Sequence, residues 1–326
     1  MRAVVLKRFP DGIPCSADFA VVPAPPPKVV IDGVRIQIRF LSLDPYLRGV
    51  ISGRHMGHSM ALGDVVPGSG VGEVVESMSA DFAPGDWVQG EFGWREEAVV
   101  VASQLRRLPI GIAPSTALGV LGMPGLTAYA GVNDIVQPRE GETIVVSAPL
   151  GPVGSTVAQL ARRVGARVVG IAGGARKCEL ALSVLGFDDC IDYRSDDFVA
   201  ALHRACPNRI DAYFDNVGGR VLEAALGHLN LRARVALCGL IDQYNKAERP
   251  PGPNLGPVIA ARATLTGLVV YDHFHRLPAM LDELVPLVKS GELKYLEDIA
   301  HGIESTPAAF AKLMRGENIG KALVAL

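Results

Sequence analysis

The pattern of hydrophobic and polar residues divides the chain near residue 140. Before that point, Val34, Ile36 and Ile38 alternate with Arg35 and Gln37, which is the period of a strand with one buried face. Further short apolar runs follow, separated by turns that contain glycine and proline. Short strands with dense turns predict a small β-barrel or sandwich for the first third of the chain.

After residue 140, nearly continuous apolar runs alternate with segments of helical spacing. The pattern predicts helices over 155–164 and 175–185. Strands are expected at residues 143–147, 167–171, 190–193, 210–215, 235–240 and 265–270. Strands that are apolar on both faces and separated by helices are typical of a parallel sheet covered on both sides. The expected fold class is therefore α/β, with a doubly wound parallel sheet.

Composition favours two globular domains and excludes several classes of protein. The 326 residues are 49% hydrophobic, and 32 Lys and Arg face 34 Asp and Glu, for a formal net charge of -2. This balance excludes the basic surface that nucleic-acid binding requires. The uncharged stretch 109–133 contains prolines, which argues against a membrane-spanning helix. We expect neither a nucleic-acid nor a membrane partner.

The cysteines and the N-terminus bear on the cellular compartment. The 5 cysteines form no C-x-x-C pair, and their odd number is a poor basis for a disulfide framework. We interpret them as reduced thiols of a cytoplasmic protein. Residues 1–7 lack the long apolar region of a signal peptide.

The turn after strand 143–147 is the first candidate binding feature. Gly151 and Gly154 stand at the mouth of the following helix, and Pro152 between them fits a first helical turn. Glycines allow the backbone N–H groups of a helix N-terminus to approach a pyrophosphate closely. A plain strand–helix turn also favours glycine. With a second strand about twenty residues further on, nucleotide binding is the preferred interpretation.

The end of the second strand bears on which nucleotide is bound. A site for NAD usually offers Asp or Glu there to the ribose 2′-hydroxyl. Here the chain has Gly173 and Gly174 followed by Arg176 and Lys177, with no acid. Cations in place of an acid favour a 2′-phosphate, and hence NADP(H). The alternative is that Arg176 and Lys177 are solvated helix residues.

Several longer segments together resemble a known family. The chain is similar, over nearly its whole length, to zinc-independent medium-chain reductases of the leukotriene B4 12-hydroxydehydrogenase, prostaglandin reductase and NADPH-dependent alkenal/one double-bond reductase group. The segments that carry the resemblance include 44–49, 123–129, 169–174, 177–178, 186–188, 191–193, 213–219, 238–239, 243–245, 316–318 and 320–321. Their combination is far more specific than the glycine turn alone.

The resemblance implies two domains and a set of site residues. It implies a GroES-like β-barrel catalytic domain, residues 1–120 and 290–326, and a Rossmann NADP(H)-binding domain, residues 121–289. The positions implied to line the cofactor are Pro45, Met123, Thr127, Gly151, Val153, Gly154, Lys177, Tyr193, Asn216, Cys238, Tyr244 and Asn318. Of these, Lys177 and Tyr193 would face the 2′-phosphate and the adenosine ribose. Without the resemblance, Tyr193 would be a core tyrosine, and Asn216 and Asn318 would be turn residues.

The chain departs from the family pattern in two places. Pro149, Leu150 and Pro152 stand where the phosphate turn usually carries alanines. In the segment 53–60, some relatives place a tyrosine that faces the substrate, and this chain has His55 and His58 instead. These histidines are interpreted as loop residues, with contact to the substrate as the alternative.

No zinc site is expected. The segment 67–73 has neither the His nor the Cys that zinc-dependent relatives carry, and a catalytic zinc needs about three such ligands. His273 and His275 form an H-x-H pair without a visible third ligand. Alcohol oxidation would lack its usual Lewis acid. Reduction of an already polarised C=C bond is therefore preferred.

The expected activity is NADPH-dependent reduction of the C=C bond of α,β-unsaturated ketones and aldehydes, with hydride transfer to the β-carbon. Tyr244 would donate a hydrogen bond to the developing enolate, or alternatively pack against the nicotinamide, and Tyr46 is a second candidate for the wall of the site. The variable segments 53–62 and 246–256 would shape the pocket mouth. Alternatives are an NADPH quinone oxidoreductase on the same fold and a non-catalytic NADPH-binding protein. A homodimer through the edge strand 266–270 is also expected.

Overall fold

A computed structural model describes residues 1–25, 31–53, 60–248 and 250–326 of the chain. The chain forms two compact units, which we call unit 1 (1–118 and 297–326) and unit 2 (119–296). The assignment of these units to a catalytic and a cofactor-binding domain remains a prediction. Among the described residues, no helix is both long and apolar enough to cross a membrane.

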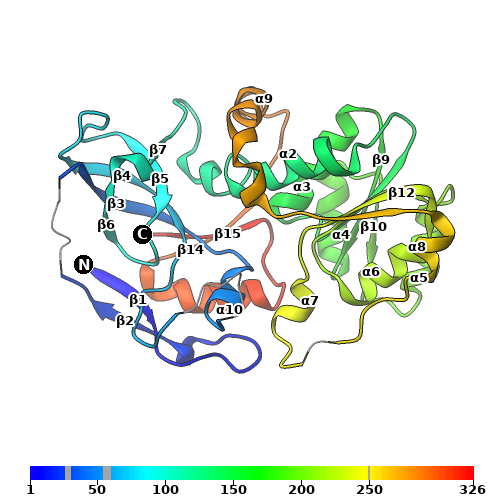
Figure 1. The fold of residues 1–326 in the computed structure, drawn as a ribbon, viewed down its shortest axis with the longest axis horizontal. Helices are drawn as coiled ribbons and strands as arrows, with labels where there is room; N and C mark the ends of the chain where they lie inside the picture. The colour runs from blue at the N-terminus through cyan, green and yellow to red at the C-terminus, as the bar shows by residue number, and fades with distance from the viewer. Residues whose placement is uncertain (26–30, 54–59, 249) are drawn as a thin grey trace. The chain divides into compact units, whose positions relative to one another are not determined.

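Unit 1 is built on a mixed sheet of seven strands in the order β14-β15-β3-β4-β5-β7, with β6 paired to β3. The first strand, β1, pairs with β2 in a separate two-stranded ribbon. The strands are β1 (Arg2–Leu6), β2 (Phe19–Pro23), β3 (Gly33–Ser42), β4 (Ser69–Ser77), β5 (Trp87–Glu91), β6 (Glu97–Val101), β7 (Arg106–Arg107), β14 (Glu297–His301) and β15 (Lys321–Ala325). The last strand of the chain joins an early one in this sheet, since β15 (red) lies beside β3 (blue) in Figure 1.

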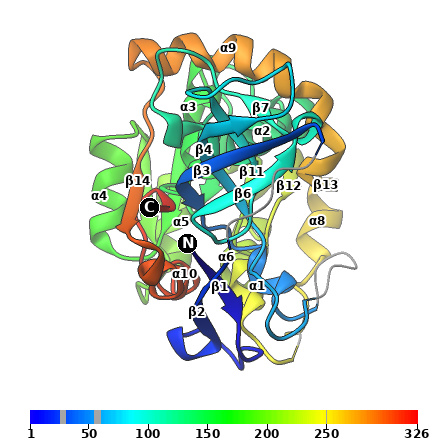
Figure 2. The same ribbon diagram turned by 90° about the vertical axis from the view of Figure 1, so that its left-hand side faces the viewer.

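The helices of unit 1 are short except for α10. They are η1 (Ser16–Asp18), α1 (Leu47–Val50), η2 (Ala102–Gln104), η3 (Pro114–Leu118), η6 (Ile303–Ser305) and α10 (Thr306–Met314). Figure 2, in which unit 1 faces the viewer, shows α10 beside the β1–β2 ribbon. Buried rings join these parts, because Phe310 of α10 meets Trp94 edge-on at 5.4 Å between ring centroids, and Phe19 of β2 at 6.3 Å.

Unit 2 contains the six-stranded parallel sheet that the sequence predicts, in the order β10-β9-β8-β11-β12-β13. The strands are β8 (Thr143–Ser147), β9 (Arg167–Ala172), β10 (Asp189–Asp192), β11 (Ile210–Asp215), β12 (Leu229–Leu237) and β13 (Thr264–Gly267). The helical segments are α2 (Met123–Ala130), the π-helix η4 (Gly131–Val136), α3 (Pro152–Arg163), α4 (Ala175–Ser183), α5 (Phe198–Ala205), α6 (Gly219–Leu226), α7 (Ile241–Tyr244), α8 (Gly256–Ala261), η5 (Val270–Arg276) and α9 (Leu277–Ser290).

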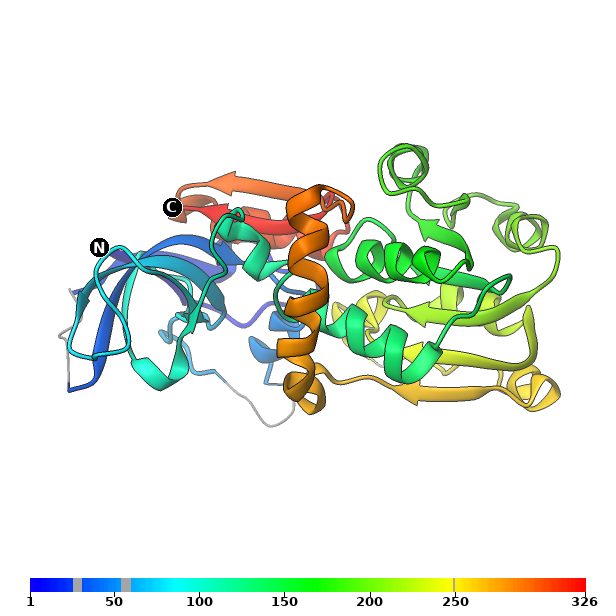
Figure 3. The ribbon, with the colours of Figure 1, turned by 90° about the horizontal axis from the view of Figure 1, so that it is seen from above.

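Helices cover both faces of this sheet. Helices α5, α6 and α8 share a buried cluster with one face, in which Val145, Tyr213 and Val235 take part. On the other face, Gly131 approaches Phe214 so closely that a Cβ would lie 2.3 Å from the ring. Helix α9, orange in Figure 3, packs against α2 after η5. The expected α/β class with a doubly wound sheet is confirmed.

Two strand predictions place the end of the strand three residues too late, while those for β9 and β10 are wrong by a single residue. The strand expected at 235–240 begins earlier and ends at Leu237, because the N–H groups of Cys238 and Gly239 both turn to the carbonyl oxygen of Asp215, at 2.8 and 3.1 Å. The strand expected at 265–270 is shorter, since Val270 already begins η5.

A buried ion pair joins two distant segments of unit 1. The Lys321 ammonium, 2% exposed, pairs with the carboxylate of Asp44 and donates to the carbonyl oxygen of Leu43 at 2.9 Å. The hydroxyl of Ser42 donates to the other carboxylate oxygen of Asp44. A buried charge without its partner is strongly unfavourable, so this pair fixes the start of β15 against the segment that follows β3.

Replacing Lys321 by Met keeps an apolar stem but leaves Asp44 without its cation. We expect Lys321→Met to lower the free energy of unfolding of unit 1 by about 3–5 kcal/mol, the usual cost of breaking a buried pair. The change is measured by urea titration of tryptophan fluorescence, because Trp87 and Trp94, the 2 tryptophans of the chain, both lie in unit 1.

The control is Arg39→Ala, which removes the half-exposed ion pair of Arg39 with Glu73 between β3 and β4. An exposed pair contributes less than about 1 kcal/mol, so this variant should unfold near the wild type. Equal midpoints for Arg39→Ala and Lys321→Met would contradict a stabilising role of the buried pair.

Candidate functional site

The order in which the chain adds strands to the sheet of unit 2 reverses between β8 and β11. From β8 the chain proceeds through β9 to β10 on one side, and then returns to β11, β12 and β13 on the other side. Such a switch point, at the carboxyl ends of the strands, is where open parallel sheets bind nucleotides. Ser147 ends β8 and Asp215 ends β11 at this point.

The turn between β8 and α3 presents an open helix N-terminus. Gly151 is the N-cap residue of α3 and has no side chain that could cap the helix, and Pro152 occupies the first turn as expected. A Cβ on Gly154 would lie 2.4 Å from the carbonyl oxygen of Ala148, so only glycine permits this close packing of helix against turn. The N–H groups of Val153 and Gly154 stand in this first turn, where an anion is favoured.

The prolines that depart from the family pattern fit the turn. Pro149 packs against β9. A Cβ added to Gly170 would lie 3.2 Å from the Cβ of Pro149. Leu150 is buried at 3% exposure. The larger residues of the turn therefore fill space over β9 that the absence of a side chain at Gly170 leaves open.

A buried carboxylate organises the switch point. Asp215 has no solvent exposure, and one of its oxygens, Oδ1, accepts hydrogen bonds from the hydroxyls of Ser147 at 3.0 Å and Tyr213 at 2.7 Å. The backbone N–H groups of Val217 and Gly218 also donate to the carboxylate, at 3.0–3.1 Å. Burial raises the pKa of Asp215 above its ordinary value, while the hydrogen bonds oppose this shift.

Asn216 is held in the same network. Its backbone N–H donates to the Ser147 hydroxyl at 2.8 Å, and its side-chain Nδ2 donates to the Ser147 carbonyl oxygen at 2.8 Å. Both groups of Asn216 are thus fixed against the end of β8. The structure places this predicted site residue at the switch point.

Cys238 and Tyr244 lie beside this network. Cys238 directly follows β12, and the Tyr244 phenol oxygen accepts the backbone N–H of Leu240 at 3.3 Å. Burial raises the pKa of Tyr244, and it raises the pKa of the Cys238 thiol to about 12. Both groups are therefore protonated at neutral pH, and the phenol keeps a proton that it can donate.

Helix α2 carries Met123 and Thr127. The Thr127 hydroxyl donates to the Met123 carbonyl oxygen at 2.8 Å, so it points back along its own helix. Helix α2 packs against α3.

The residues predicted at the 2′-phosphate end follow β9 and β10. The Tyr193 ring lies over Gly173, where a Cβ would stand 2.9 Å from the ring and 3.1 Å from its hydroxyl. Lys177 is half-buried in the first turn of α4. Arg176 instead forms an exposed ion pair with Glu179 at 2.9 Å, as a solvated helix residue does.

The remaining predicted residues belong to unit 1. Pro45 and Tyr46 follow Asp44, and Tyr46 is the N-cap residue of α1. Asn318 precedes β15 and donates from Nδ2 to the Gly320 carbonyl oxygen at 2.8 Å. The buried pair of Lys321 with Asp44 connects these two segments. His55 and His58 lie outside the described residues.

Sequence reasoning missed two features of this region. It overlooked the Ser147–Tyr213–Asp215 network, whose signal was a polar residue that ends each of two mostly apolar strands. It also overlooked Arg194, a cation directly after Tyr193.

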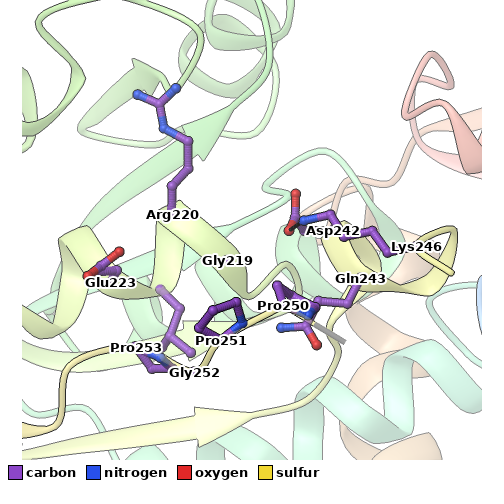
Figure 4. A pocket seen from close by; sticks show the side chains of 11 residues that line it. Gly219, Arg220, Glu223, Asp242, Gln243, Lys246, Pro250, Pro251, Gly252 and Pro253 are labelled. Carbon is purple, nitrogen blue, oxygen red and sulfur yellow. Dashed lines mark hydrogen bonds and ion pairs between the residues drawn. The ribbon is translucent and has the colours of Figure 1, made fainter. Parts of the chain in front are cut away.

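The segment 246–256 borders a hollow in unit 2, of about 300 Å³, shown in Figure 4. Its walls come from α6, α7 and the prolines of the following segment: Gly219, Arg220, Leu222, Glu223, Asp242, Gln243, Lys246, Pro250, Pro251, Gly252 and Pro253. Asp242 pairs with Lys246 at 2.6 Å, and the Arg220 guanidinium lies over the Phe198 ring. Arg220, Asp242 and Lys246 are thus engaged within the protein.

Potential metal ligands are not clustered in the part of the chain that the structure describes. No group of three or more His, Cys, Asp or Glu side chains there is arranged to hold a metal ion. In the H-x-H pair, His273 faces Asp134 at 3.6 Å, and its ring lies 6.3 Å from that of His275.

Comparison with known proteins defines the class. Residues 2–108 match the family model described as the N-terminal domain of oxidoreductase, and residues 152–286 match the model described as zinc-binding dehydrogenase. The NADPH-dependent curcumin reductase of Escherichia coli is 42% identical over 99% of this chain and 96% of its own length. The NADP⁺-dependent 2-alkenal reductase of Nicotiana tabacum is 40% identical over 99% and 96%. Prostaglandin reductase 1 of Bos taurus is 36% identical over 99% and 98%.

A solved structure agrees with these relatives. The crystal structure of CurA from Vibrio vulnificus in complex with NADPH superposes with a TM-score of 0.94, at 39% identity over 100% of this chain and 99% of that one. The chain therefore belongs to the medium-chain dehydrogenase/reductase family. Within that family it belongs to the zinc-independent group of alkenal and prostaglandin reductases. The family, the fold class and the oxidoreductase class predicted from the sequence are thus confirmed.

Proposed function

We propose that this chain is an NADPH-dependent reductase of the C=C bond of α,β-unsaturated ketones and aldehydes. The observation that carries the proposal is the half-buried phenol of Tyr244 beside the hydrogen-bonded switch point of an open parallel sheet. Relatives that match 99% of the chain are named as NADPH-dependent curcumin reductase and NADP⁺-dependent 2-alkenal reductase, and these names support the assignment.

The residues of unit 2 fit the cofactor. NADPH, when bound, supplies the hydride of the reaction. The first turn of α3 would bind its pyrophosphate through the N–H groups of Val153 and Gly154, since Gly154 leaves no side chain in the way. Asn216 and Cys238 stand at the switch point, where the nicotinamide half would lie.

Tyr244 would act on the substrate. Transfer of the hydride to the β-carbon leaves negative charge on the carbonyl oxygen of the substrate, as an enolate, and a proton from solvent at the α-carbon then gives the saturated carbonyl compound. A hydrogen-bond donor aimed at that oxygen lowers the barrier, and it does so most where water is excluded. The half-buried phenol of Tyr244 keeps its proton at neutral pH, so it can donate to the enolate oxygen.

Unit 1 contributes three residues to this proposal. Pro45 and Asn318 would line the cofactor together with Met123 and Thr127 of unit 2, and Tyr46 would form part of the substrate wall. The support is the buried pair of Lys321 with Asp44, which fixes the segments that carry Pro45, Tyr46 and Asn318. Their approach to the residues of unit 2 is part of the proposal.

The test is a steady-state screen of NADPH oxidation over alkenals, enones, prostaglandin-like ketones and quinones. We expect turnover of alkenals and enones, with the saturated carbonyl compound as product by mass spectrometry. Higher kcat/KM on quinones than on enones would instead favour the quinone oxidoreductase alternative. Tight NADPH binding without oxidation on any substrate would favour a non-catalytic NADPH-binding protein.

Replacing Tyr244 by Phe removes the proposed donor and keeps the ring. We expect kcat on a small enone such as 4-hydroxynonenal to fall by about 100-fold, the usual cost of losing one oxyanion donor. The dissociation constant of NADPH should stay near the wild-type value. Tyr271→Phe, at an exposed position of η5, is the matched control. An unchanged kcat would leave Tyr244 only a packing role against the nicotinamide.

We also propose a cytoplasmic homodimer formed through the edge strand β13. The described cysteines are free, which is usual in a reducing compartment. Strand β13 ends the sheet, and Leu255, Ile259 and Phe274 in the flanking segments are exposed. An open strand edge pairs readily with a second copy.

Replacing Gly267 by Pro tests the dimer. The Leu268 N–H bonds to Leu237 of β12, and because bonds alternate along a strand, the Gly267 N–H faces the open edge. We expect light scattering to give the mass of two 34.5 kDa chains for the wild type and of one for Gly267→Pro. A monomeric wild type would contradict the dimer.

A further inference from the structure

An arginine at the end of β10 lies across the glycine turn at the end of β9. The two strands are parallel neighbours, with Asp192 opposite Ala172, so the residues that follow them meet at the same edge of the sheet. Gly173 and Gly174 follow β9, and Tyr193 and Arg194 follow β10.

A shared carboxylate fixes the two turns. Oδ1 of Asp192 accepts the backbone N–H of Gly174 at 2.8 Å and the backbone N–H of Arg194 at 2.9 Å. Gly174 adopts φ +102°, a left-handed conformation that favours glycine. The carboxylate of Asp192, at the end of β10, thus accepts hydrogen bonds from the backbone of both turns. These hydrogen bonds hold the two turns in place without a ligand.

The Arg194 side chain folds back over this turn. Its Nε lies 3.2 Å from the position of a Cβ on Gly173, and its Nη1 lies 3.9 Å from that on Gly174. The guanidinium also lies over the Tyr193 ring, 5.9 Å from the centroid. The absence of side chains at 173 and 174 therefore leaves room for the guanidinium beside the N-terminus of α4.

Among the residues that the structure describes, the guanidinium of Arg194 has an aromatic neighbour, Tyr193, but no carboxylate partner. In the described part of the chain, Arg194 forms no ion pair with a carboxylate, whereas Arg176 pairs with Glu179 and Arg204 pairs with Asp197. Its five N–H donors form a planar fork that matches a phosphate group. Lys177, in the first turn of α4, adds a second cation at this end of the sheet.

We propose that Arg194 is a specificity-determining residue that binds the 2′-phosphate of NADPH. This inference rests on the proposed function and assigns to Arg194 a share of the discrimination against NADH. The phosphate would lie over the Gly173–Gly174 turn, between the Arg194 guanidinium and the side chain of Lys177. NADH has a hydroxyl at this position, so the guanidinium would add little to its binding.

The experiment measures binding of two fragments by titration calorimetry: adenosine 2′,5′-bisphosphate, which carries the 2′-phosphate, and 5′-AMP, which lacks it. We expect Arg194→Gln to lower the affinity for the bisphosphate by about 10- to 100-fold, which is the range for losing a charge-assisted hydrogen bond. Binding of 5′-AMP should not change. Arg194→Lys should retain part of the affinity, since it keeps the charge but loses the planar fork.

The matched control is Arg204→Gln, which removes an exposed arginine of α5 that already has a carboxylate partner. It should bind both fragments as the wild type does. In turnover, Arg194→Gln should lower kcat/KM for NADPH and leave that for NADH unchanged, while kcat at saturating NADPH stays near the wild-type value.

Two failures are distinguishable. If the wild type prefers the bisphosphate and Arg194→Gln binds it equally well, the role of Arg194 is overturned and NADPH use stands. If the wild type binds the bisphosphate no better than 5′-AMP, the proposed use of NADPH fails, and the inference fails with it.

Discussion

The buried carboxylate of Asp215 is the constraint on which the end of the parallel sheet depends. A carboxyl group without solvent exposure must have hydrogen-bond donors around it, because an unsatisfied one costs several kcal/mol. Ser147 and Tyr213 supply side-chain donors, and Val217 and Gly218 supply backbone donors. The backbone carbonyl oxygen of Asp215 in turn accepts hydrogen bonds from the N–H groups of Cys238 and Gly239, directly after β12. One residue therefore sets the geometry of three strand ends, and Asn216 and Cys238 take their places from it.

The fold of unit 2 could be predicted well from the sequence, since apolar runs specify buried strands. Strands β8 and β11 have the predicted bounds, Thr143–Ser147 and Ile210–Asp215. The end of β12 could not be predicted, because it depends on another strand. There, the carbonyl oxygen of Asp215 accepts the N–H groups of Cys238 and Gly239, which follow β12. Periodicity describes the burial of one segment, and carries no information about such a contact between segments.

The site shows the same limit at the level of side chains. The glycine turn could be found because Gly151 and Gly154 form a local pattern. Arg194 could not, because its position depends on the pairing of β10 with β9 and on the lack of a carboxylate partner among described residues. In the same way, Lys321 and Asp44 lie at opposite ends of the chain, and only the sheet of unit 1 brings their charges together.

The residues proposed to act in the reaction and the residues proposed to distinguish NADPH from NADH lie at different strand ends of the sheet. The groups proposed to act on the substrate and nicotinamide follow β8, β11 and β12, and depend on the Asp215 network. The groups proposed to recognise the 2′-phosphate follow β9 and β10, and depend on Asp192. The described hydrogen bonds of these two carboxylates share no residue. We therefore expect a change at the β9–β10 end to alter the preference between NADPH and NADH without disturbing the Asp215 network, because no described hydrogen-bond partner of the Asp192 carboxylate is also a partner of the Asp215 carboxylate.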